Sequence, residues 1–224
     1  RVEGQYRERG RRYRFDSEGM ARVVLEQMKE ADIRFSEISF ESILGYLQVA
    51  VARMERGRMI EEMPEAELEW GIEERTLAVR IMHRIEEERD IKPVEAEAGF
   101  LGILLASKRI HGFGKDNFVI SERIDRMIMD MLEAVYQAFH MEFRDNLNLR
   151  MMLNQHLVSM DIRMRYGIHI DNPLLPGIQK KYLLAYSIAV LGSSVLRRYY
   201  GKEIPEEETG FLAFLFALAL EERD

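Results

Sequence analysis

The stretch Leu153-Asn-Gln-His-Leu-Val-Ser-Met-Asp-Ile-Arg-Met-Arg-Tyr-Gly167 decides the fold of this 224-residue chain. It carries His156, then Arg163 seven residues later, and it ends in a glycine. Seven residues make about two helical turns, so we expect His156 and Arg163 on one face of a helix, roughly 10 Å apart. A glycine four residues after the arginine is where such a helix ends. The stretch therefore predicts a helix that stops at Gly167.

The same skeleton occurs earlier in the chain, with a tyrosine in the place of the histidine. Tyr46 is followed by Arg53 and then by Gly57 at the same spacing. A second element repeats as well, since Glu97-Ala-Gly-Phe-Leu-Gly-Ile-Leu-Leu-Ala106 matches Glu208-Thr-Gly-Phe-Leu-Ala-Phe-Leu-Phe-Ala217. The two elements lie 51 residues apart in the first copy and 52 in the second. A period near 110 residues is too long for a solenoid and predicts two tandem domains.

The composition favours helices and excludes cysteine chemistry. The chain has 14 methionines and only 5 prolines, and it has no cysteine, so disulfides, thiolate catalysis and cysteine-ligated zinc are excluded. The longest apolar run, residues 210–220, is too short to span a bilayer. We therefore expect a cytoplasmic protein with no membrane partner.

The charge is unevenly spread. Residues 1–15 hold six arginines and two glutamates, a net charge of +4. Since the whole chain has a net charge of −7, the rest of it has a net charge of −11. An acidic body repels phosphate backbones, so direct nucleic-acid binding by the body is disfavoured. The chain begins without an initiator methionine, and we interpret residues 1–15 as a linker from a missing N-terminal nucleic-acid-binding domain.

Apolar residues recur at helical spacing, and no segment alternates in the manner of a strand. The pattern predicts an all-α fold of two homologous helical bundles, each with about five helices, over residues 16–115 and 116–224. Glycine-rich residues 111–117 are the expected linker, and residues 171–177 the expected turn. The predicted helices cover residues 16–31, 39–54, 73–88, 95–109, 146–166, 178–198 and 206–222, and a further helix capped by Ser121 carries Ile124, Ile128, Met131 and Val135 on one face.

Three motifs of the second copy resemble the phosphotransferase system (PTS) regulation domain, or PRD, of sugar-responsive bacterial transcription activators and antiterminators. They are Gln155-His156-Leu157 with Arg163, Asn172-Pro-Leu-Leu-x-x-Ile178-x-x-x-Tyr182, and Glu208-x-Gly210-Phe211-Leu212. The order and spacing of these motifs, together with the duplication, extend the resemblance from residue 16 to the end. It implies compact helical bundles that mediate homodimerisation.

The resemblance also implies phosphoryl transfer to histidine. In this family the phosphocarrier HPr or a PTS IIB domain donates the phosphoryl group, and each domain typically offers two acceptor histidines. A neutral imidazole nitrogen suits this chemistry because it is nucleophilic near pH 7. His156 is the implied phosphoacceptor, and its alternative is a structural histidine hydrogen-bonded in a domain interface. The other three acceptor positions are degenerate, being occupied by Tyr46, Leu104 and Leu215.

Each of the remaining polar candidates can also be explained by a structural role. Arg163 could stabilise a phosphate as a bidentate donor, but its counterpart Arg53 stands beside Tyr46, where no phosphohistidine can form, which favours a structural role for this arginine. Glu97 and Glu208 start apolar helices and are expected to act there as helix-start residues. The other histidines fit no shared motif, and no histidine pair has metal-ligand spacing, so we expect no metal and no cofactor.

These observations predict a regulatory module without enzymatic turnover, because no nucleophile, base and orienting group recur at workable spacing. The module would control the dimerisation and activity of an N-terminal DNA-binding domain. One alternative is the regulatory part of an RNA-binding antiterminator. Another is a dimerisation or ligand-sensing scaffold that works without phosphorylation.

Overall fold

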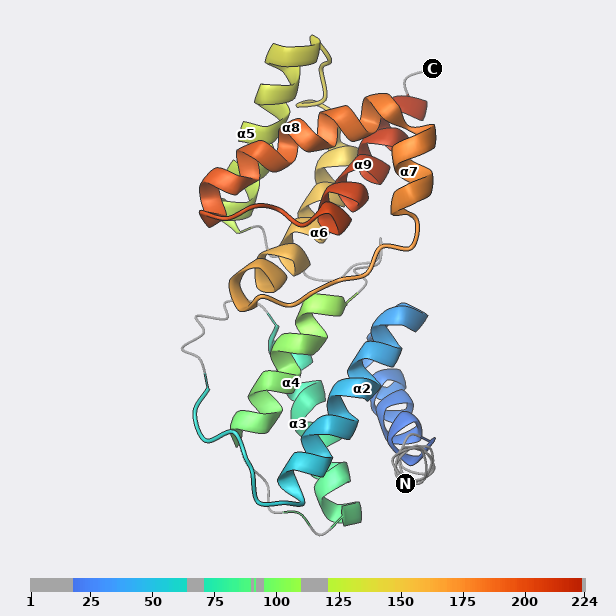
Figure 1. The fold of residues 1–224 in the computed structure, drawn as a ribbon, viewed down its shortest axis with the longest axis vertical. Coiled ribbons are helices and arrows are strands. Elements are labelled where there is room, and N and C mark those ends of the chain that lie inside the picture. Colours follow the sequence, from blue (N-terminus) through green and yellow to red (C-terminus); the bar gives the residue numbers. More distant parts are fainter. Residues whose placement is uncertain (1–17, 64–70, 90, 92–94, 110–120, 223–224) are drawn as a thin grey trace, which may run out of the picture. The chain divides into compact units, whose positions relative to one another are not determined.

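The computed structural model describes residues 18–63, 71–89, 91, 95–109 and 121–222 (Figure 1). These residues form two compact units, one within residues 1–110 and the other within residues 111–224. The described part of the chain contains nine helices, and its only extended pairing is an isolated bridge between Phe35 and Arg109. The predicted all-α class is confirmed.

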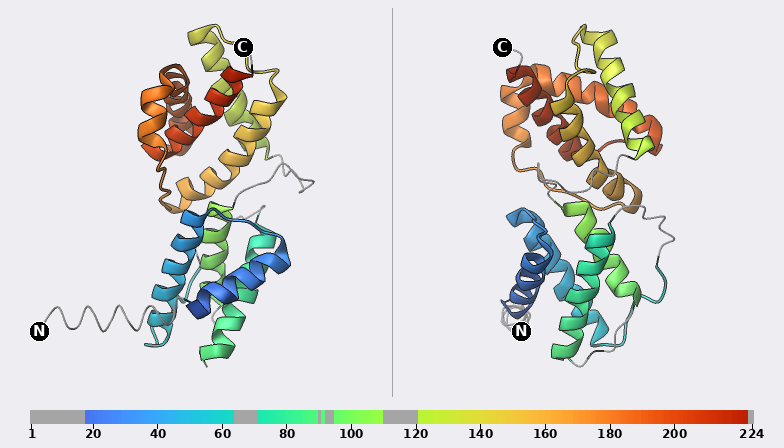
Figure 2. Two further views of the ribbon diagram at one scale, coloured as in Figure 1. Left: turned by 90° about the vertical axis from the view of Figure 1, so that its right-hand side faces the viewer. Right: turned by 180° about the vertical axis from the view of Figure 1, so that it is seen from behind.

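The first unit has four helices among its described residues, close to the ranges expected. They cover residues 18–31, α2 (Glu37–Met54), α3 (Ile72–Arg89) and α4 (Glu95–Lys108). The apolar positions that predict α2 are all buried, namely Ile43, Leu47, Ala50, Val51 and Met54. Residues of α2, α3, α4 and the helix over 18–31 share one core. Figure 2 shows these four helices gathered together. This agreement follows from helical periodicity, which places every third or fourth residue on the same face.

The second unit has five helices around its own core: α5 (Glu122–Phe139), α6 (Leu147–Tyr166), α7 (Leu175–Lys181), α8 (Leu183–Tyr200) and α9 (Glu206–Glu221). The predicted turn over 171–177 is wrong in its second half, because α7 begins there with Pro176 in its first turn. Proline is tolerated at that position, since the first helical amides need no partner. The predicted helix over 178–198 is broken at Tyr182, whose φ of −116° and ψ of 53° are not helical.

The two units repeat the same arrangement. In each, the closest helix pair has equivalent members, α3 with α4 and α8 with α9, and the helix that carries the Tyr46 or His156 position packs against the second member. Both of those helices have a polar N-cap, in which Ser36 accepts a hydrogen bond from Ser39 N and Asn146 accepts one from Leu149 N.

The two arginine helices are also followed by the same turn. Gly57 and Gly167 have φ values of +68° and +65°, which suit glycine because other residues strain there. Gly167 is the C-cap of α6, as predicted. In the first unit α2 ends slightly earlier, and Gly57 closes the turn that follows it.

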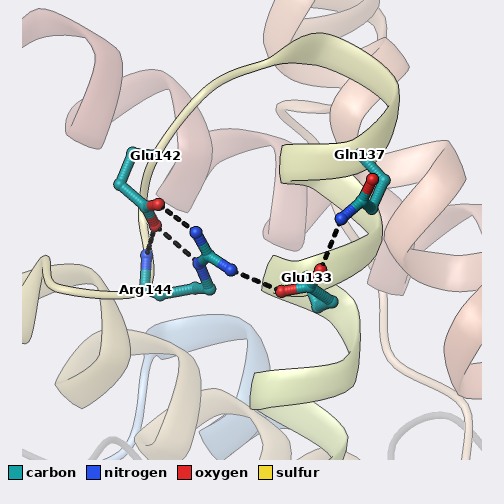
Figure 3. Close-up of polar contacts among 4 residues, drawn as sticks. All are labelled: Glu133, Gln137, Glu142 and Arg144. Carbon is teal, nitrogen blue, oxygen red and sulfur yellow. Dashed lines mark hydrogen bonds and ion pairs between the residues drawn. The ribbon is translucent and has the colours of Figure 1, made fainter.

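An arginine fixes the connection between α5 and α6 (Figure 3). Arg144 donates from Nε to Oε1 of Glu142 at 2.8 Å and from Nη1 to Oε2 of Glu133 at 2.6 Å, and its guanidinium lies 4.1 Å from the centre of the Tyr136 ring. Gln137 donates to the other oxygen of Glu133. These hydrogen bonds from Gln137 and Arg144 lower the pKa of Glu133. The network ties the segment after α5 back onto that helix.

Some expectations fall on residues that the structure does not describe. They are the N-terminal linker over 1–15, the glycine-rich linker over 111–117 and the domain boundary at 115/116. Residues 64–70, at the position equivalent to α7 in the first unit, also lie outside the described ranges. Among the described helices, none combines the length and apolar character needed to cross a membrane.

Candidate functional site

His156 and Arg163 of α6 meet a carboxylate from another helix, Glu208 in the first turn of α9. Arg163 donates from Nε to Oε1 of Glu208 at 2.5 Å and from Nη2 to Oε2 at 2.9 Å. The Nε2 atom of His156 lies 3.1 Å from the same Oε2. The helical spacing thus brings His156 and Arg163 to one face, as the sequence predicted. It also places both of them on one carboxylate.

This cluster is shielded from water. The side chains of Arg163 and Glu208 are 3% and 1% exposed, and that of His156 is 16% exposed. Burial by itself raises the pKa of Glu208, but the hydrogen bonds and charges of His156 and Arg163 outweigh it and lower that pKa to about 2. Glu208 is therefore an ionised carboxylate held inside the unit beside Arg163 and His156.

The imidazole of His156 presents one ring nitrogen to Glu208. This atom, Nε2, is buried and lies 3.1 Å from Oε2 of Glu208. The ring packs against Phe211, with ring centres 5.6 Å apart and planes tilted by 40°. A neutral imidazole nitrogen that carries no proton is nucleophilic and accepts electrophilic groups.

The first unit contains the same ion pair without the histidine. Arg53 of α2 donates from Nη1 and Nη2 to the two oxygens of Glu97 in α4, at 2.7 and 2.6 Å. The amide of Ile60 also donates to Glu97 at 2.8 Å, and Arg53 Nη1 donates to the Arg58 carbonyl. The Glu97 side chain is fully buried, but Arg53 is 27% exposed. This pair joins two helices and the turn after α2.

Tyr46 occupies the histidine position of the first unit. Its hydroxyl oxygen is buried and has no hydrogen-bond partner. Burial raises the pKa of Tyr46, and the negative charge of Glu97 adds to the rise while Arg53 opposes it, so that the pKa reaches about 12. The neutral phenol cannot replace an imidazole as a phosphoryl acceptor.

The two leucines at the remaining acceptor positions serve packing. Leu104 of α4 and Leu215 of α9 are half-buried, and each packs against the core of its own unit. Neither side chain has an atom that could accept a phosphoryl group. Of the four acceptor positions implied by the resemblance, His156 alone has a nucleophilic nitrogen.

Sequence reasoning missed the role of Glu97 and Glu208. Both lie in the first turn of their helices, as expected, but each carboxylate receives the arginine of another helix instead of acting only at its own helix start. The available signal was the repetition of the arginine and the glutamate in both copies. A buried charge needs an opposite charge nearby, so an arginine that occurs in both copies predicts an acidic partner that also occurs in both.

The glycine two residues after each glutamate has a packing role. A Cβ atom at Gly210 would lie 2.7 Å from Nδ2 of Asn172 and 2.7 Å from Cδ1 of Leu175, and one at Gly99 would overlap the side chain of Met63. Asn172 in turn donates to the carbonyl of Glu207 at 3.0 Å. The Glu-x-Gly element therefore combines an ion pair with close approach of a neighbouring segment.

The other histidines that the structure describes lie away from this cluster, since His83, His140 and His169 are exposed. His111 is outside the described residues. The described residues contain no group of three or more histidine, aspartate or glutamate side chains arranged to hold a metal ion.

Residues 129–219, from α5 to α9, match the family model of the PRD domain. The chain therefore contains a PRD domain, as the motifs predicted.

Two curated relatives extend the similarity across both units. The "Probable licABCH operon regulator" of Bacillus subtilis (strain 168) is 25% identical over 206 residues, which are 90% of this chain and 32% of the relative. The "Transcriptional regulator ManR" of the same organism is 22% identical over 216 residues, 92% of this chain and 32% of the relative. The chain is thus related to PRD-containing transcriptional regulators and spans about a third of their length.

Proposed function

We propose that this chain is the regulatory module of a bacterial transcription regulator and that phosphorylation of His156 by the PTS controls it. HPr or a PTS IIB domain donates the phosphoryl group in the cytoplasm. The module forms a homodimer, and a change in dimer arrangement passes the signal to an N-terminal DNA-binding domain. The module has no enzymatic turnover of its own.

The observation that carries this proposal is the position of His156 Nε2, buried and 3.1 Å from a carboxylate that is itself paired with a guanidinium. Ionisable groups held together in this way are frequent at functional sites. The PRD match and the two related regulators support the regulatory role. An RNA-binding antiterminator would use the same module, and the upstream domain of the full-length protein decides between the two.

Intact-mass spectrometry under conditions that preserve phosphohistidine tests the proposal. The protein is incubated with phosphoenolpyruvate, enzyme I and HPr, with and without a cognate IIB domain. We expect one added phosphate in the wild type and none in His156→Ala. The matched control is His169→Ala, which removes an exposed histidine of the same unit and should still accept one phosphate. A phosphate that persists in His156→Ala, or its absence with every donor, contradicts the proposal.

Dimerisation is tested separately by light scattering during size-exclusion chromatography. We expect a dimer at tens of micromolar protein. A strictly monomeric module would contradict signalling through dimer arrangement, even if His156 accepts a phosphate.

A second function is favoured by the residues at the other acceptor positions. Tyr46, Leu104 and Leu215 cannot carry phosphohistidine, so a dimerisation or ligand-sensing scaffold without phosphorylation also fits the first unit. An unchanged mass with all donors, combined with a dimer, would select this function.

A further inference from the structure

The nitrogen proposed to accept the phosphoryl group is already opposed by a negative charge. Nε2 of His156 lies 3.1 Å from Oε2 of Glu208, a carboxylate that is 1% exposed. A phosphoryl group bonded to that nitrogen carries nearly two negative charges at pH 7. Charges of the same sign at such a distance repel strongly where water cannot screen them. The present position of Glu208 is therefore incompatible with phosphorylation of Nε2.

Arg163 can relieve this repulsion, because it binds Glu208 at the same oxygen that faces His156. It shares the Oε2 atom of Glu208 with His156, donating to it at 2.9 Å. Arg163 and His156 also belong to the same helix, α6, seven residues apart. A phosphoryl group offers three strong acceptor oxygens, and guanidinium binds phosphate as well as carboxylate.

Resting on the proposed phosphorylation of His156, we propose that Glu208 is a positioning residue that gates this reaction. The Arg163–Glu208 ion pair and the phosphoryl group on Nε2 are alternative states. In the first state Arg163 neutralises Glu208, and the carboxylate blocks Nε2. In the second, Glu208 has moved away and Arg163 binds the phosphoryl oxygens.

The chemical step can be written without a further reactant beyond the phosphoryl donor. The lone pair of His156 Nε2 attacks phosphorus, and the bond from phosphorus to the nitrogen of the donor breaks. The donor nitrogen leaves with a proton, and the proton on the other ring nitrogen of His156 passes to solvent. Glu208 takes no part in bond making, and only its displacement is required.

The exchange has a structural consequence. The Arg163–Glu208 pair joins α6 to α9, whereas a pair between Arg163 and phosphorylated His156 lies within α6 alone. Phosphorylation therefore removes one ion pair between these two helices. We therefore expect the backbone amides in the first turn of α9, which contains Glu208, to lose protection against hydrogen exchange.

The first unit provides a matched control within the same chain. Its Arg53–Glu97 pair also joins two helices, but Tyr46 stands in place of the histidine. No phosphoryl group can compete for Arg53, so this pair should persist whatever the state of His156.

The test uses phosphoramidate, a small chemical donor that needs no PTS protein, and measures the rate of phosphate addition to His156 by mass spectrometry. Glu208→Gln removes the opposing charge while keeping the side-chain shape, and we expect phosphorylation about tenfold faster than in the wild type. Glu97→Gln makes the same change in the first unit and should leave the rate unchanged. Glu208→Asp, which restores the charge, should react more like the wild type than like Glu208→Gln.

Two measurements on the wild type do not depend on how well a variant folds. Nitrogen NMR should place the phosphoryl group on Nε2. Hydrogen exchange should become faster in residues 206–212 after phosphorylation and remain unchanged in residues 95–101. A phosphoryl group on the other ring nitrogen, or unchanged exchange in residues 206–212, would overturn the gate, as would a Glu208→Gln rate at or below that of the wild type.

The gate and the proposed function fail in different ways. If phosphoramidate gives the expected rates but no PTS donor modifies the protein, the gate stands and the proposed PTS input is wrong. If PTS donors phosphorylate His156 while Glu208→Gln gives no acceleration, the proposed function stands and the gate is wrong.

Discussion

The two units use the same arginine–glutamate pair in two different surroundings. In the second unit Arg163 is almost fully buried, and His156 shares its carboxylate partner. In the first unit Arg53 reaches partly into solvent, and backbone groups of the following turn share the pair. The side chain at the histidine position there is the unpartnered Tyr46.

This difference separates structure from function at the site. The ion pair forms whether or not a histidine is present, so it belongs to the architecture of both units. The response to a phosphoryl group that we propose for the second unit requires the histidine. The first unit therefore shows what the pair does as a purely structural link between two helices.

The largest expected effect comes from removing the carboxylate in each unit. Glu208→Ala leaves the buried guanidinium of Arg163 without this counter-charge and should lower the free energy of unfolding of the second unit by about 3–5 kcal/mol. Glu97→Ala should cost the first unit less, about 1–3 kcal/mol, because the partly exposed Arg53 can turn to water. Urea unfolding of the two variants, followed by hydrogen exchange in each unit, measures both losses. Equal losses would show that the difference in burial between the arginines has no energetic meaning.

The next effect is the response of the second unit to acid. The pKa of Glu208 is lowered from 4.5 to about 2, so its contribution to stability is present above pH 4.5 and is lost as the pH falls towards 2. Such a shift corresponds to about 3 kcal/mol. Acid unfolding of the wild type should lose this amount within that window, and Glu208→Gln should lack this part of the pH dependence. Parallel curves for the two proteins would contradict the lowered pKa.

The smallest effect concerns the hydroxyl of Tyr46. Tyr46→Phe removes a buried polar atom that has no partner, so the first unit should gain up to about 1 kcal/mol at neutral pH. The raised pKa of about 12 means that the wild type loses stability as the pH rises from 10 through 12, because the unfolded phenol ionises first. Chemical unfolding at pH 7 and pH 11 measures both effects. A loss at pH 7 would indicate that the hydroxyl has a stabilising partner.

The helices were largely predictable from the sequence because apolar periodicity is a local property. The apolar positions of α2 and the glycine end of α6 illustrate this. Errors arose where a local signal was ambiguous or absent. Pro176 is an ambiguous signal because proline occurs both in turns and in the first turn of a helix, and the break at Tyr182 has no glycine or proline to mark it.

The site was only half predictable. Helical spacing placed His156 and Arg163 on one face, and the family resemblance implied that Tyr46, Leu104 and Leu215 stand at acceptor positions. The partner of the arginine was not predictable from spacing, since Glu208 lies 45 residues beyond Arg163 in the sequence. The repetition of this glutamate in the first copy, as Glu97, indicated a common role in both units. It did not indicate that the arginine is its partner.

The helical class and the internal duplication follow from the sequence alone, because they depend on residue type and spacing along the chain. The tertiary structure decided which groups meet. Packing of α6 against α9 brings the Glu208 carboxylate to the histidine and arginine of another helix. These partners keep the buried carboxylate ionised. Long-range contacts of this kind depend on how helices pack, which no local pattern specifies.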